Sequence, residues 1–346
     1  MQQVEMICLD DLVPENHNYR KFAKIWSFKH AEKRLKELEK DNPHKGHGLL
    51  RIFKCLLLQF MENCSDRELE RFIQENNAAR WFCGFNLRDN TPDHSIFCQM
   101  RKKIGTKILS KIFADLREQL KSHRLISEVF TFVDATHLIA KANLWEERDK
   151  AIKEKYEKLN NENISKFSPD SQAKIGCKGK DKYWYGYKQH TSVDMQSGLI
   201  NKVAVTPANL TDSSGFKHVC PSSGAAYADK GYCVGAAPRI AQGKGVHLAA
   251  IKKNNMKEKN KEKDRWYSRI WSPYERVFSR RERRVRYRGI KKNQFAVFMQ
   301  SICFNLKRLL VLSPPKFVSP IGTGMSKFCQ DRQISTLKPQ KFKKKH

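Results

Sequence analysis

The chain has 346 residues, enough for two domains, and its 67 lysine and arginine residues against 36 acidic ones give a formal net charge of +31. Such an excess repels itself and is typical of proteins whose partner is a polyanion, above all nucleic acid. No apolar run approaches the roughly 18 residues of a membrane-spanning helix, and acidic residues near the N-terminus argue against a secretory signal, so we expect no membrane association.

The ten cysteines are scattered along the chain, with no closely spaced pair of the kind that holds a structural zinc ion. Thiols distributed through apolar segments are typical of a reducing compartment. We therefore expect a cytoplasmic protein without structural zinc.

Residues 1–123 are predicted to form a helical domain. Ser65 and Glu68 have the spacing of a capping box, in which each side chain bonds the other's backbone N–H at a helix start. The two helices around this turn form either a DNA-reading helix-turn-helix or a pair that merely packs together. Apolar residues at helical spacing predict four helices, over 22–39, 49–63, 95–103 and 107–123.

The next part of the chain carries acidic residues at conspicuous places. Residues 129–137 are apolar and β-branched, which predicts a buried strand ending at Asp134. A second short strand, 225–228, is followed by Asp229. Because a charge at the tip of a buried strand is costly unless something binds it, both acids are candidate site residues.

A third carboxylate, Glu275, lies at the start of a strongly basic helix predicted over 275–288. Two Mg²⁺ ions about 4 Å apart can hold the attacking and leaving oxygens of a phosphodiester, and they need only a few carboxylates. Two strand-end aspartates and one helical glutamate in a basic chain therefore indicate a Mg²⁺-dependent enzyme acting on nucleic acid. Each acid also has a local explanation, as a turn residue or, for Glu275, as part of a capping box.

The remaining elements complete an α+β fold. Residues 144–161 and 294–312 are predicted helices, 252–263 a lysine-rich linker, and residues after 313 a basic, disordered tail. The order strand, hairpin, helix, strand, helix, strand, acidic helix is that of a ribonuclease H-like mixed sheet, here over 124–312 with flanking helices. The other predicted strands are 185–193, 199–205 and 246–251.

Several polar residues are less convincing as metal ligands. Asp194 ends a strand and Asp212 opens a helix, and both are interpreted as turn residues. The histidines lack partners at ligand spacing and are interpreted as structural: His137, His190 and His218. Residues 178–185 alternate cations with aromatics, which favours either stacking on nucleic acid or an ordinary strand.

Five ordered blocks resemble bacterial insertion-sequence transposases of the DDE type, in the insertion-sequence-five family. They are Phe132 to Thr136, Ser168 to Asp170 with Tyr185 to Asp194, Val205 to Ser213, Ala228 to Tyr232 and Pro273 to Phe278. Thr91 to Ser95 also resembles that family's helical domain.

The resemblance implies that Asp134, Asp229 and Glu275 are the catalytic triad, holding Mg²⁺ for which Mn²⁺ can substitute. The implied reaction nicks the ends of the element and joins the freed 3′-OH to target DNA. The implied partners are double-stranded DNA, as terminal inverted repeats and target, and a second copy of the chain, with no small-molecule cofactor. The implied location is the bacterial cytoplasm, on the nucleoid when bound to DNA. We expect DNA contacts from Lys180, Lys182, Trp184, Lys188, Lys230, Arg276, Arg280, Arg281 and Arg284.

Two positions depart from the family pattern: Trp271 stands where an arginine is common, and Glu282 where a cation is common. A decayed transposase that only binds DNA, and a ribonuclease H-like nuclease, are therefore alternatives. On one helix Glu275 and Glu282 would lie about 10.5 Å apart along the axis, too far to share one metal pair. We expect Glu275 to be the ligand and Glu282 to balance neighbouring arginines.

Overall fold

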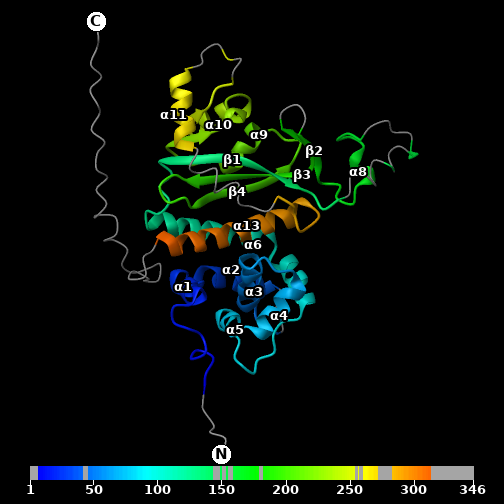
Figure 1. Ribbon diagram of the computed structural model, residues 1–346, viewed down its shortest axis with the longest axis vertical. Helices are drawn as coiled ribbons and strands as arrows, with labels where there is room; N and C mark the ends of the chain where they lie inside the picture. The colour runs from blue at the N-terminus through cyan, green and yellow to red at the C-terminus, as the bar shows by residue number, and fades with distance from the viewer. Residues whose placement is uncertain are drawn as a thin grey trace, which may run out of the picture.

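The protein combines an N-terminal helical part with a mixed β-sheet flanked by helices, a ribonuclease H-like arrangement (Figure 1). This is the fold class that the sequence predicts. A computed structural model describes residues 7–41, 46–142, 149, 153–154, 159–178, 182–253, 256, 260–271 and 283–312.

The N-terminal part is helical, as predicted. The capping box is confirmed, since Ser65 N–H donates to Glu68 at 2.7 Å and Glu68 N–H donates to the Ser65 hydroxyl at 3.3 Å. The helices are α1 (Asn18–Ile25), α2 (Lys29–Asp41), α3 (Leu49–Met61), α4 (Asp66–Glu75), α5 (Asn77–Cys83) and α6 (His94–Ser122).

The prediction of one continuous helix over 22–39 is wrong, because the chain breaks between α1 and α2. Phe28 has a φ of 59°, a left-handed conformation that ends the helical hydrogen bonding. Its ring lies 4.3 Å from that of Trp26, and both are buried in the core. Burial of two large aromatic rings thus outweighs the helical periodicity of this segment.

The sheet contains six strands: β1 (Phe130–Ile139), β2 (Lys174–Lys178), β3 (Lys182–Asp194), β4 (Ile200–Pro207), β5 (Ala225–Ala228) and β6 (His247–Ala250). β1, β3 and β4 are antiparallel neighbours, whereas β5 pairs in parallel with β1 and β6 in parallel with β5. β2 pairs antiparallel with the first residues of β3.

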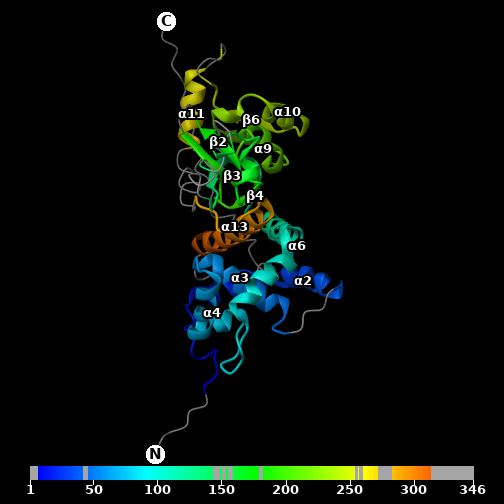
Figure 2. The ribbon, with the colours of Figure 1, turned by 90° about the vertical axis from the view of Figure 1, so that its right-hand side faces the viewer.

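Helices cover both faces of the sheet (Figures 1 and 2). One face packs on α9 and α10 through a small core that includes Val133, Ala226 and Phe216. The other face packs on α13, which also contacts α3 and α6, so that one continuous core spans sheet and N-terminal helices. The helices of this part are α8 (Ile164–Phe167), α9 (Asp212–Val219), α10 (Ala236–Gly243), α11 (Lys261–Trp271) and α13 (Ile290–Leu312).

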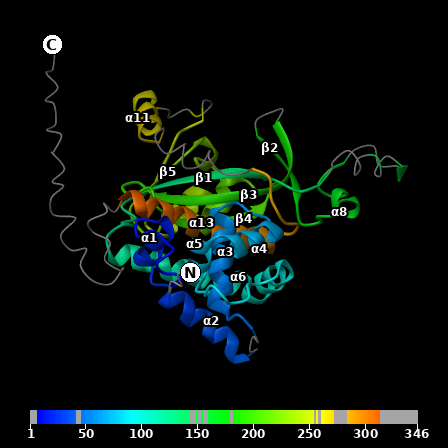
Figure 3. The ribbon, with the colours of Figure 1, turned by 60° about the horizontal axis from the view of Figure 1, so that its bottom comes forward.

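At the periphery, β2 and α8 extend from one end of the sheet and α11 lies at the other (Figures 1 and 3). α13 is long and apolar enough to cross a membrane, and among the described residues one helix passes this test. Over half of its most apolar stretch, 56%, is buried, as in the core helix of a soluble protein. It therefore gives little reason to expect a membrane span.

The predicted helix over 275–288 is wrong for residues 283–288, the part of it that the structure describes. Ile139 N–H donates to the carbonyl of Arg283 at 2.6 Å, and Val285 N–H donates to the Ile139 carbonyl at 2.9 Å. These bonds hold residues 283–285 extended beside the end of β1, which a helix cannot do. The predicted linker over 252–263 also ends early, because α11 begins at Lys261.

Candidate active site

Asp134 and Asp229 lie on neighbouring strands at the same level. In the parallel pair of β1 and β5, Val133 is the partner of Ala228, and each acid is the next residue. Two residues earlier, the rings of Phe132 and Tyr227 touch with centroids 5.8 Å apart, which shows that this set of side chains shares one face. Since paired strands run about 4.8 Å apart, the structure brings the two predicted acids together.

Asp134 does not end its strand, contrary to the prediction. β1 continues to Ile139 because β3 remains hydrogen-bonded to it along the whole length, from Thr131 to Ile139. What ends beside Asp134 is its other neighbour, β5, at Ala228. Asp134 therefore lies one residue past the end of the β1–β5 pairing, while its backbone remains paired with β3.

The charge of Asp134 is strongly disfavoured. Burial raises the pKa of its carboxyl to about 7, and the negative charges of Asp229 and Asp212 add to the effect. The Ala135 backbone N–H and the Lys178 ammonium act in the opposite direction but do not compensate. A bound cation would offset this negative charge and favour the ionised form of Asp134.

Asp212, which the sequence interpretation assigned to a turn, is a further carboxylate whose charge acts on Asp134. It is the first residue of α9, but Thr211 performs the capping by accepting from Ser214 N–H at 3.2 Å. The Asp212 carboxylate instead accepts from the Lys188 ammonium of β3 at 2.8 Å. A Cβ added to Gly231 would lie 3.3 Å from its other oxygen, so it also touches the chain that follows Asp229.

Tyr232 closes the inner side of the cluster. Its side chain is 1% exposed, and its hydroxyl has no hydrogen-bond partner among the described residues. Burial raises the pKa of this hydroxyl, as do the charges of Asp134, Asp212 and Asp229. A buried O–H without a hydrogen-bond partner is costly.

His190 lies under the same helix and is neutral. It is fully buried, its Nε2 lies 2.8 Å from the Thr206 hydroxyl, and burial lowers the pKa of its imidazole to about 4. Gly215 of α9 packs directly on the ring, with no room for a Cβ. These contacts give His190 a packing role. Of the other two histidines, His137 faces the Trp184 ring at 5.4 Å and His218 is exposed.

Glu275, the predicted third ligand, lies outside the described residues, together with Glu282. The chain on either side of it is described: α11 ends at Trp271, and Arg283 is hydrogen-bonded to Ile139 of β1. The segment that contains Glu275 is thus attached at its far end to the strand that carries Asp134.

The residues predicted to contact DNA fall into three groups. Lys230, next to Asp229, and Arg284, beside the end of β1, are exposed. Lys188, in contrast, is 9% exposed with its ammonium held by Asp212, and Trp184 is half-buried against His137. The side chain of Lys182 and the residues Lys180, Arg276, Arg280 and Arg281 lie outside what the structure describes.

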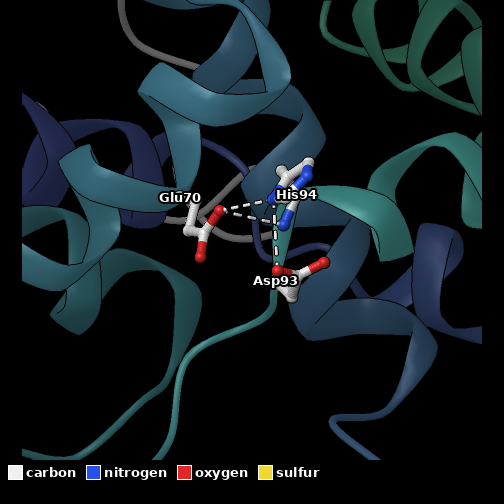
Figure 4. Close-up of side chains that lie close together, drawn as sticks. All are labelled: Glu70, Asp93 and His94. Atoms are coloured by element: carbon white, nitrogen blue, oxygen red, sulfur yellow. Dashed lines mark hydrogen bonds and ion pairs between the residues drawn. The ribbon is translucent and has the colours of Figure 1, made fainter.

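A second polar cluster, in the N-terminal part, joins α4 to the start of α6. The His94 Nδ1 lies 2.8 Å from a Glu70 oxygen and 3.1 Å from an Asp93 oxygen, and the three side chains point toward one another (Figure 4). Asp93 also caps α6 by accepting from Ser95 N–H at 2.7 Å. The imidazole nitrogen that faces both carboxylates is the one that a metal would need, so the cluster is explained as a hydrogen-bonded contact between helices.

Comparison with known families assigns most of the chain. Residues 7–103 match the family described as Transposase domain (DUF772), and residues 126–306 match the family described as Transposase DDE domain. Searches of curated proteins and of solved structures found no match.

Proposed function

Because the chain belongs to the DDE transposases, we propose that it nicks the ends of an insertion sequence and joins the 3′-OH to target DNA, using two Mg²⁺ ions. Asp134, Asp229 and Glu275 are the proposed ligands, and Mn²⁺ can substitute for Mg²⁺. The observation that carries this proposal is the parallel register that sets Asp134 beside Asp229 at the end of β5.

The described residues suit a hard divalent cation. Carboxylate oxygens are the ligands that Mg²⁺ prefers, and the raised pKa of Asp134 reflects burial and negative charge that a bound cation would offset. When bound, two such ions stabilise the attacking and leaving oxygens of an in-line displacement at phosphorus. The exposed Lys230, the residue after Asp229, is available to contact a DNA phosphate that approaches this acid.

The finer identity follows from the resemblance of the sequence blocks. We propose that the chain is of the insertion-sequence-five type, that it recognises terminal inverted repeats and target DNA as a homodimer, and that it acts in the bacterial cytoplasm on the nucleoid. The net charge of +31 supports a DNA partner.

The test uses a duplex that carries the inverted repeat flanking the gene. Asp134→Asn and Glu275→Gln should abolish Mg²⁺-dependent nicking and strand transfer while end binding persists, and Glu282→Lys should keep or raise cleavage. Glu15→Gln, which changes an exposed charge in the N-terminal part, is the matched control. Near-wild-type nicking by Asp134→Asn would refute the site, and nicking without strand transfer would identify a nuclease.

A further inference from the structure

The largest cavity found among the described residues is a groove of about 1410 Å³ between the two parts of the chain. One wall is the turn between α3 and α4, residues 63–68, and the other consists of residues 139–142 and 284–288. We call it the interdomain groove. It lies outside the acidic cluster, and it combines the turn that the sequence offers as a possible DNA-reading element with the basic segment after Glu275.

The groove has a positive charge that its own acids do not cancel. Four exposed cations line it, and no ion pair to them is found within the described part of the chain: Arg67, Lys141, Arg284 and Arg288. Two acids on the wall are already engaged. Both oxygens of Asp66 accept from Arg101, at 2.8 and 2.5 Å, and Glu68 accepts from Ser65 N–H in the capping box.

Contacts of Arg286 join the two walls of the groove. Arg286 donates to the carbonyl of Cys64 at 2.8 Å and to the side chain of Asn63, and its guanidinium lies 5.5 Å from the Phe60 ring. Asn63 has a φ of 59°, which turns the chain between α3 and α4 toward this arginine. The groove is therefore preformed, and a ligand would not have to bring its walls together.

The position of the groove relative to the acids can be expressed in nucleotides. The groove begins at Ile139, the last residue of β1, which lies five residues after Asp134 on the same strand. Five residues of a strand span about 17 Å. Successive phosphates of one DNA strand are spaced by about 3.4 Å along the helix axis. The groove thus lies about five nucleotides, or slightly more, from a phosphate bound at the acidic cluster.

We propose that the interdomain groove binds the phosphate backbone of the DNA end, about five to eight nucleotides inside the cut. This inference rests on the proposed function and assigns a task to the N-terminal domain: its α3–α4 turn forms one wall of the DNA path. Charge complementarity favours duplex DNA as the ligand, because exposed arginines bind phosphate oxygens. In addition, the proposed reaction at the acidic cluster acts on a phosphodiester, which brings DNA close to the groove.

The first experiment measures the salt dependence of binding of the inverted-repeat duplex by fluorescence anisotropy. Each phosphate contact contributes about 0.9 to the log–log slope. The double variant Arg67→Ala/Arg284→Ala should therefore lower the slope by about 2. Arg239→Ala, which removes an exposed cation of α10 on the side of the sheet away from the N-terminal helices, should leave the slope unchanged (Figure 2). Unchanged melting temperatures establish that each variant is folded.

The second experiment replaces single phosphates by uncharged methylphosphonates along the duplex. Replacement five to eight nucleotides inside the cut should weaken binding by the wild type several-fold and have little effect on the double variant. A slope that stays at the wild-type value, or equal sensitivity of both proteins to these replacements, would overturn the proposal. If either of these outcomes is found while the wild-type protein of the same preparation nicks the duplex, the groove assignment fails and the proposed function stands.

Discussion

At the scale of single residues, the site is a concentration of negative charge on side chains whose positions are fixed by the fold. The backbone of Asp134 is held by its pairing with β3, and the Asp212 carboxylate is held by the Lys188 ammonium. Such strain at a functional site lowers the stability of the empty protein and favours cation binding.

Asp134→Asn should stabilise the metal-free protein at pH 8. In the folded state the pKa of this carboxyl is raised to about 7, so folding favours the protonated form. This contribution to the free energy of unfolding is fully present below the unfolded pKa and is lost as pH rises from about 4 to 7. Allowing for partial exposure, we expect a gain of about 2 kcal/mol at pH 8 and none near pH 3.

Urea unfolding in the presence of a chelator measures this difference. Added Mg²⁺ should stabilise the wild type but not the Asn variant, since only the wild type keeps the ligand. If Asp134→Asn were less stable than the wild type without metal, the charge of Asp134 would be balanced in some other way.

Lys188→Met should destabilise the metal-free protein by about 1–3 kcal/mol, because it leaves Asp212 uncompensated beside Asp134 and Asp229. Mg²⁺ should restore much of this loss by supplying positive charge to the same carboxylates. The matched control is Lys202→Met, which removes a half-buried lysine beside Glu128 on the same sheet. Its loss of stability should be insensitive to Mg²⁺. If Mg²⁺ changed the stability of both variants equally, Asp212 would not belong to the metal site.

At the scale of elements, α9 brings Asp212 to the site because it packs very closely on the sheet. Gly215 allows this approach, since its backbone rests on the imidazole of His190 in β3. Phe216 and Val219 of the same helix bury their side chains in the core shared with Val133. The position of the carboxylate thus depends on a helix–strand contact rather than on its own turn.

Gly215→Ala should destabilise the protein by about 3 kcal/mol, because the new methyl group overlaps the fully buried His190 ring and forces α9 away from β3. Gly243→Ala, at the end of α10 with open space around it, is the control and should gain up to about 1 kcal/mol. Thermal unfolding measures both, and a neutral effect of Gly215→Ala would mean that α9 is free to shift.

At the scale of the whole molecule, buried polar networks connect the N-terminal helices to the sheet. Glu128, which precedes β1, accepts from Asn201 of β4 at 2.6 Å and from Ser222 N–H at 3.2 Å, and it lies 3.2 Å from Lys121 of α6. α13 adds an apolar connection, because it packs on β4, α3 and α6 at once. These contacts hold the sheet, which carries the acidic site, against the N-terminal helices, which form one wall of the interdomain groove.

Glu128→Gln should cost about 2–3 kcal/mol at pH 7 and nothing near pH 2. Burial raises the pKa of this carboxyl, but the Asn201 hydrogen bond and the charges of Lys202 and Lys121 outweigh it and lower the pKa to about 2. A lowered pKa gives stability that is present above the unfolded value and lost as pH falls from about 5 to 2. Denaturant unfolding across this range should show the two proteins converging in acid; a constant difference would contradict the charge argument.

The sequence by itself determined the features that depend on local pattern. Apolar alternation placed the strands around Asp134 and Asp229, and apolar periodicity placed α3 and α13, because burial of one face dictates such spacing. The two aspartates could therefore be named in advance. The capping box at Ser65 is likewise a local motif, and it is present in the structure.

Only the tertiary structure decided what depends on contacts between distant segments. Asp212 joins the site through Lys188, 24 residues away, and the groove is built by Arg286 bonding to a turn 222 residues earlier. The length of β1 was set by its pairing with β3, and the break at Phe28 by the packing of two aromatic rings. Packing and long-range hydrogen bonds outweigh local preference at these places, and no local pattern records them.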